Sequence, residues 1–239
     1  NLGFSANLIN RLKNNSRVFV NGNPVFVIHK VCPGDVVEAF LDFTEETGNI
    51  IPEKMNLDIL FEDDALIVID KPAGMVVHPT ALHLRGTVAN GLMHYFLEKN
   101  LHIKIRPVSR LDKDTTGVIV FAKNQFVQES LINQISEGKF KKEYIGVVHG
   151  TVKDQKGTID LPIARKPGSI MLRHISESGS RAVTHFSVLE NLKDASLLQF
   201  SLETGRTHQI RVHCMAIGHP LFGDYLYSGI KTDLIGRQA

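Results

Sequence analysis

Four charged residues, Arg110, Asp112, Lys113 and Asp114, lie within five positions just before the apolar run GVIVFAK at residues 117–123. Such a run predicts a buried β-strand. Carboxylates and cations that are crowded beside a core commonly belong to a functional site, because burying charge is costly to a fold. A carboxylate at a strand entrance is partly desolvated and rigidly held, as a nucleophile or base requires. Asp112 is therefore the leading catalytic candidate.

A second concentration of cations occurs in the segment TGRTHQIRVH, which contains Arg206, His208, Arg211 and His213. The apolar residues that alternate with them predict that these four side chains occupy the first turns of one helix, with some pointing into the protein or a cleft. Arginine suits a planar, two-pronged grip on a carboxylate or phosphate. The two histidines are not spaced four apart and no cysteine pair accompanies them, so no metal site is expected.

Basic residues also gather at the start of a predicted strand, where Lys141 and Lys142 precede Tyr144. Cations for phosphates and a ring for a base together are typical of a nucleic-acid groove, although an ordinary solvated surface has a similar composition. Lys71 is a further candidate cation, in the turn-like segment DKPAGMVVHP.

The elements that must position these residues predict an α+β fold. Helices are interspersed among strands that are mostly joined as hairpins, which favours α+β over a parallel wound sheet. One predicted helix follows the catalytic segment: Asn124 is a candidate N-cap and Gly138 ends it. A helix also covers the segment GTVANGLMHYFLEKN.

The chain divides into three predicted parts. Residues 1–43 predict a small helix-and-strand module, residues 44–56 are a polar linker, and residues 57–239 form the main domain. With a net charge of +2 and a pI near 8.5, a local basic groove is permitted but a strongly polyanion-binding composition is excluded. No apolar run approaches the ~18 residues of a membrane span, no signal peptide opens the chain, and two distant cysteines form no disulfide framework. A cytoplasmic monomer without membrane attachment is expected.

Four segments, in this order and spacing, resemble RNA pseudouridine synthases of the RluA type: DKPAGMVVHP, SRLDKDTTGVIVFAK, KKEYIGVVHG and ETGRTHQIRVHCMAIGHPLFGDYLY. The resemblance extends from about residue 57 to the end of the chain. The N-terminal segment resembles part of a small RNA-binding module that is shared with a ribosomal protein, here lacking its first helix. Ser109 replaces the family's usual histidine, Thr115-Thr116 replaces Thr-Ser, and the chain is expected to end early, at LIGRQA.

The resemblance implies a central, mainly antiparallel mixed sheet that is flanked by helices and holds an RNA-binding cleft. It also implies isomerisation of uridine to pseudouridine in RNA without a cofactor or metal. Asp112 matches the catalytic aspartate, and whether it attacks the sugar or promotes elimination stays open. Arg211 matches the arginine that pairs with the aspartate, Tyr144 matches the tyrosine that packs on the uracil, and Arg110 matches the arginine that holds the target nucleotide out of its stack. The expected RNA contacts are completed by a further set of basic residues: Lys71, Lys141, Lys142, Arg206 and His208.

Ribosomal RNA is the favoured substrate and transfer RNA is the alternative. A non-catalytic RNA-binding protein would also explain the basic surfaces, but it gives no reason for Asp112 beside a core strand. A glycosidase would use Asp112 with Asp114 as a second carboxylate, and we rank it well below the other two.

Overall fold

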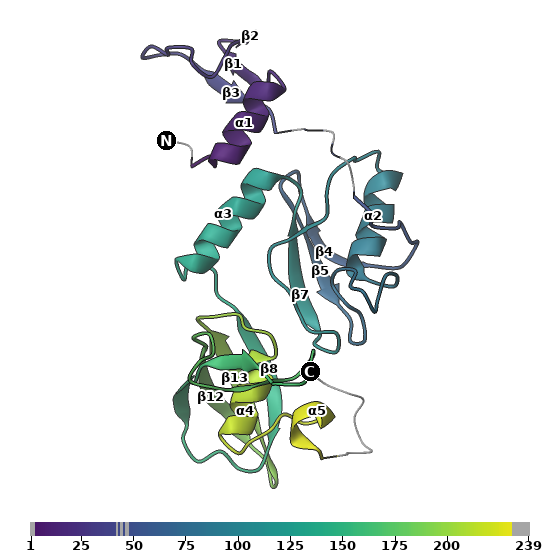
Figure 1. The fold of residues 1–239 in the computed structure, drawn as a ribbon, viewed down its shortest axis with the longest axis vertical. Helices are drawn as coiled ribbons and strands as arrows, with labels where there is room; N and C mark the ends of the chain where they lie inside the picture. Colours follow the sequence, from purple (N-terminus) through teal and green to yellow (C-terminus); the bar gives the residue numbers. More distant parts are fainter. Residues whose placement is uncertain (1–2, 42, 44, 46–47, 231–239) are drawn as a thin grey trace. The chain divides into compact units, whose positions relative to one another are not determined.

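The computed structural model describes residues 3–41, 43, 45 and 48–230, and the chain forms two compact units (Figure 1). Unit 1 contains the chain up to Leu111 together with Thr116–Ser136, and unit 2 contains Asp112–Thr115 and the chain from Glu137 onward. Part of the predicted linker, residues 44, 46 and 47, and the predicted early end, residues 231–239, lie outside the described residues.

Unit 1 begins with a helix and a small antiparallel sheet. Helix α1 spans Ala6–Asn14, and the Ser5 hydroxyl caps it by accepting the N–H of Leu8 at 3.2 Å. Strands β1 (Val18–Val20), β2 (Asn23–Pro24) and β3 (Val37–Ala39) form a sheet in the order β2-β1-β3. Helix and strands agree with the elements expected of residues 1–43, whose identity as an RNA-binding module stays a prediction.

The larger sheet of unit 1 has four antiparallel strands in the order β4-β5-β7-β6. Its members are β4 (Asp58–Glu62), β5 (Leu66–Lys71), β7 (Gly117–Ala122) and β6 (Arg106–Pro107). Alternate residues of β5 are buried, including Ile67 and Ile69, which pack with Leu92 and Phe96 of helix α2 (Val88–Glu98). The apolar run that predicted a strand after Asp112 is thus β7.

Helix α3 (Gln125–Ser136) follows β7, and it begins as the sequence predicts: the Asn124 side chain accepts the N–H of Val127 at 2.9 Å. The start of α3 also contacts the N-terminal segment. Phe4 and Phe126 pack edge to face at 5.0 Å, and Ser5 donates to the Glu129 carboxylate at 3.0 Å.

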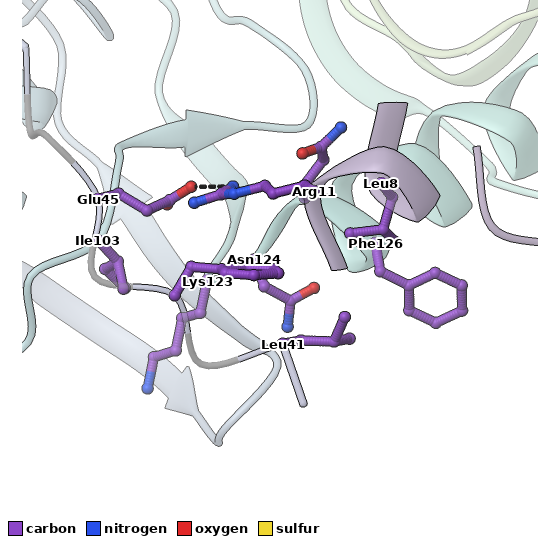
Figure 2. Close-up of a pocket in the computed structure, with 10 residues that line it drawn as sticks. Leu8, Arg11, Leu41, Glu45, Ile103, Lys123, Asn124 and Phe126 are labelled. Atoms are coloured by element: carbon purple, nitrogen blue, oxygen red, sulfur yellow. Dashed lines mark hydrogen bonds and ion pairs between the residues drawn. The ribbon is translucent and has the colours of Figure 1, made fainter. Parts of the chain in front are cut away.

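A buried carboxylate strengthens this contact within unit 1. Glu45 accepts hydrogen bonds from Arg11 of α1 and, at 2.6 Å, from Arg106 of β6. Figure 2 shows Arg11 reaching toward Glu45, next to Leu8 of α1. The N-terminal helix is therefore joined to the rest of unit 1 by both apolar and ionic contacts.

Unit 2 is built on a second four-stranded antiparallel sheet, with the order β8-β13-β12-β9. Its strands are β8 (Glu143–His149), β13 (Ala195–Leu202), β12 (Val183–Asn191) and β9 (Lys156–Asp160). A separate hairpin joins β10 (Ile163–Arg165) to β11 (Arg173–Ile175). Helices α4 (Gln209–Ala216) and α5 (Tyr225–Ser228) complete the unit, and Cys214 of α4 is buried in the cluster that contains Val148, Leu198 and Phe200.

The predicted α+β class with antiparallel sheets and few helices is confirmed, but the sheet arrangement differs from the expectation. In place of one central mixed sheet, the described strands form two four-stranded sheets, one in each unit, besides the β2-β1-β3 sheet and the β10–β11 hairpin, and every strand pair is antiparallel. Short turns such as Glu62–Leu66 impose antiparallel pairing on neighbouring strands. The predicted RNA-binding cleft stays a prediction.

Candidate active site

Asp112 lies in a tight turn of unit 2, closed by a hydrogen bond from the N–H of Thr115 to the Asp112 carbonyl at 3.3 Å. Its side chain is 21% exposed. The carboxylate is therefore partly shielded from water but still open to a ligand, as a reacting group must be.

Arg211 places a cation beside this carboxylate. The Arg211 Nη1 atom lies 3.4 Å from Asp112 Oδ2, within hydrogen-bond distance. Its other donors hold Asp224: Nε and Nη2 each lie 2.7 Å from a different Asp224 oxygen. Burial opposes the charge on Arg211, but the hydrogen bonds and charge of Asp224, helped by Asp112, outweigh it and raise the Arg211 pKa. The guanidinium therefore stays charged and is fixed in orientation.

Asp224 was not among the predicted site residues. Its side chain is 1% exposed and lies just before α5, in a segment, HPLFGD, that reads as an ordinary loop. A charged residue in a loop is usually solvated, so only the partner Arg211, thirteen positions earlier in the chain, reveals its role. Sequence alone gives no signal for that pairing.

His208 also lies beside Asp112, with its Nε2 atom 3.7 Å from Asp112 Oδ2. Its backbone is left-handed, at φ 59°, and it precedes the first residue of α4. The other ring nitrogen, Nδ1, lies 2.6 Å from the Tyr227 hydroxyl, which accepts the N–H of Arg173 at 3.0 Å. Burial lowers the His208 pKa, the positive charges of Arg211 and Arg173 lower it further, and Asp112 opposes them. The imidazole is therefore neutral at pH 7.

The loop before α4 corrects one prediction. Arg206 and His208 do not lie on helical turns, because α4 begins only at Gln209. The Gln209 side chain folds back and accepts the N–H of Arg206 at 2.9 Å, and it also accepts the Thr204 hydroxyl at 2.8 Å. These bonds compete with helix formation and hold the preceding loop in place.

Tyr144 begins β8 and packs against the apolar cluster of unit 2. Burial raises the pKa of its hydroxyl, and the negative charge of Asp112 raises it further. The ring is thus close enough to Asp112 for their charges to interact, and its hydroxyl is protonated at neutral pH.

The remaining predicted RNA contacts differ in exposure. Arg110, Lys141 and Arg206 are exposed, and Lys142 is partly buried. Lys71 is fully buried, and its ammonium donates to the carbonyls of Pro72 and Met75, each at 2.8 Å. A buried ammonium offers no surface to a phosphate, so this position corrects the expectation that Lys71 binds RNA; its contacts instead fix the local loop.

His213, the second histidine of α4, is also buried. Its ring nitrogens lie 2.9 Å from the Thr184 hydroxyl and 2.9 Å from the Leu161 carbonyl, so both are satisfied within the core. Among the residues that the structure describes, no group of three or more His, Cys, Asp or Glu side chains is placed to hold a metal ion. In the same part of the chain, no helix has the length and apolar character needed to cross a membrane.

Comparison with known proteins identifies relatives of this arrangement. The family model described as RNA pseudouridylate synthase matches residues 65–216. The uncharacterized RNA pseudouridine synthase YlyB of Bacillus subtilis is 43% identical over 226 residues, covering 93% of this chain and 74% of that protein. Ribosomal large subunit pseudouridine synthase D of Nitrosomonas europaea is 42% identical over 204 residues, covering 85% of this chain and 59% of that protein.

A solved structure shares the fold. Human RNA pseudouridylate synthase domain containing 1 has a TM-score of 0.60 and 25% sequence identity to this chain. The match covers 77% of this chain and 72% of the human one.

Proposed function

Because the chain belongs to the RNA pseudouridine synthase family, of the RluA type, and isomerises uridine to pseudouridine in RNA, we propose that Asp112 carries out the chemistry at the sugar. In this reaction the bond between N1 of uracil and C1′ of ribose breaks, the base turns, and a bond from C5 to C1′ forms. C5 loses a proton and N1 gains one. Asp112 assists by attacking C1′ or by promoting elimination at the sugar.

The observation that carries this proposal is the arrangement of Asp112, Arg211 and Asp224. A carboxylate needs a cation to stay ionised in a shielded site, and Arg211 lies 3.4 Å from Asp112. Because Asp224 accepts from Nε and Nη2, the third nitrogen of the guanidinium, Nη1, is directed at Asp112. Asp112 is thereby oriented.

Tyr144 supplies the second part of the proposed site. A uracil that has left its stack needs a flat apolar surface to replace the lost stacking, which costs a few kcal/mol. The half-buried Tyr144 ring provides such a surface near Asp112. The exposed Arg110, two residues before Asp112, is suited to hold the target nucleotide out of its stack.

Ribosomal RNA is the proposed substrate, with transfer RNA as the alternative. Support comes from relatives named ribosomal large subunit pseudouridine synthase D, in Nitrosomonas europaea among other bacteria. This substrate places the enzyme in the cytoplasm, and light scattering of the purified protein checks the expectation of a monomer. Family membership also leaves a purely non-catalytic binder unsupported.

The test of the proposal is the substitution Asp112→Asn, which keeps the shape of the side chain and removes its charge. We expect pseudouridine formation to fall by about 10³-fold or more, while RNA affinity stays within a few-fold, because phosphate contacts carry most of the binding. Pseudouridine is mapped in cellular RNA from cells with and without the protein, and turnover is then measured on the RNA so identified.

Asp114→Asn is the matched control. It removes an equal charge from the same turn, and it should retain turnover because the mechanism uses one carboxylate. Turnover near wild type in Asp112→Asn would refute the assignment. An equal loss in both variants would favour a mechanism with two carboxylates.

A further inference from the structure

Unit 2 contains an arginine-lined groove that the chemistry at Asp112 does not use. Its volume is about 320 Å³, and its walls come from the β10–β11 hairpin, a serine-glycine turn and the loop before α4. The residues that define it are Arg165, Arg173, Ser178, Gly179, Arg206 and Thr207. Only Arg206 among these was a predicted RNA contact.

Two of the arginines face each other across the hairpin. Arg165 of β10 and Arg173 of β11 are directly opposite in the antiparallel register. Like charges in that position destabilise a strand pair. Across the part of the chain that the structure describes, neither arginine forms an ion pair with a carboxylate, and the Arg173 guanidinium instead donates to backbone carbonyls. An anionic ligand would neutralise this repulsion.

Arg206 and Lys142 make a second pair of like charges. The Lys142 pKa is lowered by burial and then by the charge of Arg206, so the two cations are close. Arg206 is held in place, because its Nε donates to the Arg181 carbonyl at 2.9 Å. Of this second pair, Arg206 lines the groove together with Arg165 and Arg173.

The serine-glycine turn that lines the groove is held firmly against β10. Ile163 and Ser180 exchange two backbone hydrogen bonds, each of 3.0 Å, which fasten the serine-glycine turn to β10. A Cβ atom on Gly179 would lie 2.6 Å from the Ile163 carbonyl carbon, so only glycine permits this approach. Ser178 and Thr207 add hydroxyl groups to the lining. Arginines beside hydroxyl donors suit a phosphate better than a cation or an apolar ligand.

The groove adjoins the residues around Asp112. The Arg173 N–H donates to the Tyr227 hydroxyl, that hydroxyl contacts His208, and His208 lies 3.7 Å from Asp112. On the other side of the groove, Arg206 and Thr207 immediately precede His208 in the chain. An anion in the groove is therefore a near neighbour of the reacting nucleotide.

We propose that this groove binds the phosphodiester backbone of the RNA next to the uridine that is converted. The proposal rests on the proposed function, because the substrate strand is what brings phosphates to this side of Asp112. Arg165 and Arg173 hold the RNA strand by charge-assisted hydrogen bonds, and relief of the repulsion between them adds to the affinity. The groove fixes where the strand lies and takes no part in bond breaking.

The test is the triple variant Arg165→Ala, Arg173→Ala and Arg206→Ala. Its affinity for a short, fluorescent, single-stranded RNA containing uridine is measured by anisotropy over a series of KCl concentrations. We expect the Kd to rise by about 100-fold or more, since three charge-assisted contacts are lost. The slope of log Kd against log salt should fall by about 2, because fewer counterions are displaced.

The matched control is Lys153→Ala, Lys156→Ala and Lys193→Ala, which removes the same charge from exposed residues toward the opposite end of the unit 2 sheet. This variant should bind the RNA with the wild-type affinity. Its slope of log Kd against log salt should lie within about 1 of the wild-type slope. Equal losses in both triple variants would show a general charge effect and overturn the proposal.

Failure of the groove and failure of the proposed function give different results. If wild type forms pseudouridine and the arginine variant binds RNA like wild type, the groove is refuted and the function stands. If the arginine variant loses affinity while Asp112→Asn forms pseudouridine as fast as wild type, the groove stands and the role of Asp112 is refuted. On an RNA that wild type modifies, the arginine variant should raise KM and leave kcat within about threefold.

Discussion

At the scale of single residues, the site depends on how Arg211 divides its hydrogen bonds. Two donors hold Asp224 at 2.7 Å each, and the weaker contact, of 3.4 Å, reaches Asp112. Asp224 is therefore a positioning residue: it neutralises and orients Arg211 without facing the substrate through its own carboxylate. Asp112 keeps a cationic partner within hydrogen-bond distance, at a longer contact than those to Asp224.

The substitution Asp224→Asn should lower kcat by about 10- to 100-fold and leave KM nearly unchanged. An amide has one acceptor oxygen where the carboxylate has two, so it cannot accept from Nε and Nη2 on separate oxygens, and Arg211 is expected to turn toward Asp112 and restrain it. Single-turnover kinetics and RNA affinity are measured on the RNA that wild type modifies.

Asp194→Asn is the control for this substitution, because Asp194 is exposed in the turn between β12 and β13. It should behave like wild type. If Asp224→Asn keeps a normal kcat per folded molecule and loses only thermal stability, Asp224 is merely structural.

The residues that could be predicted are those that stand in recognisable motifs. Asp112, Tyr144 and Arg211 each lie in a segment whose residue types match a reaction, and the structure brings all three into unit 2. Asp224 and Tyr227 could not be found that way, because their roles depend on contacts with Arg211 and His208 that only the folded chain creates. Lys71 shows the converse, since a basic residue next to a turn is ordinarily solvated but here is buried.

At the scale of elements, Glu45 joins helix α1 to strand β6. Burial raises the pKa of the Glu45 carboxyl, but hydrogen bonds from Arg106, Arg11 and the backbone N–H of Lys104 outweigh burial and lower the pKa to about 2. A carboxyl whose pKa is depressed in the folded state stabilises the fold above its unfolded pKa, near 4.5. That contribution is lost as the pH falls from about 4.5 toward 2.

Glu45→Gln should therefore lower the free energy of unfolding by about 3 kcal/mol at pH 7, because it leaves buried Arg106 without its charge partner. The difference between wild type and variant should shrink as the pH falls below about 4.5. Urea unfolding at several pH values measures both effects.

Glu38→Gln provides the comparison, since Glu38 is exposed on β3 in the same N-terminal segment. It should change the stability by less than about 0.5 kcal/mol. A pH-independent difference between Glu45→Gln and wild type would show that the charge of Glu45 is not what joins these elements.

Helices were more predictable than sheets. The spacing of apolar residues and the cap at Asn124 predicted α3, because a helix is specified by residues close in sequence. Strand partners are not local: β5 pairs with β7 across an insertion that contains α2, and β8 pairs with β13 across four intervening strands. The alternation of apolar residues cannot identify such partners. The sequence therefore predicted one central sheet where the structure has two four-stranded sheets.

At the scale of the whole molecule, the chain passes between the units three times, after Leu111, Thr115 and Ser136. The four residues Asp112–Thr115 are a short excursion of the unit 1 chain into unit 2. The strand that follows Asp112, β7, thus belongs to one hydrophobic core, while the partners of the Asp112 carboxylate belong to the other. The turn that carries Asp112 therefore continues at both of its ends into the chain of unit 1.

The burial of Cys214 makes its thiol a reporter of how often the core of unit 2 opens. Cys32 is exposed in unit 1, whereas Cys214 has no exposed surface and burial raises its thiol pKa. A thiol reagent should therefore modify Cys32 at once in native protein and reach Cys214 only during excursions that open the core of unit 2. In a Cys32→Ser background, the rate at which Cys214 is labelled measures how often that core opens. If bound RNA stabilises the core of unit 2, it should lower the labelling rate of Cys214. An equal rate with and without RNA would show that binding leaves the opening of that core unchanged.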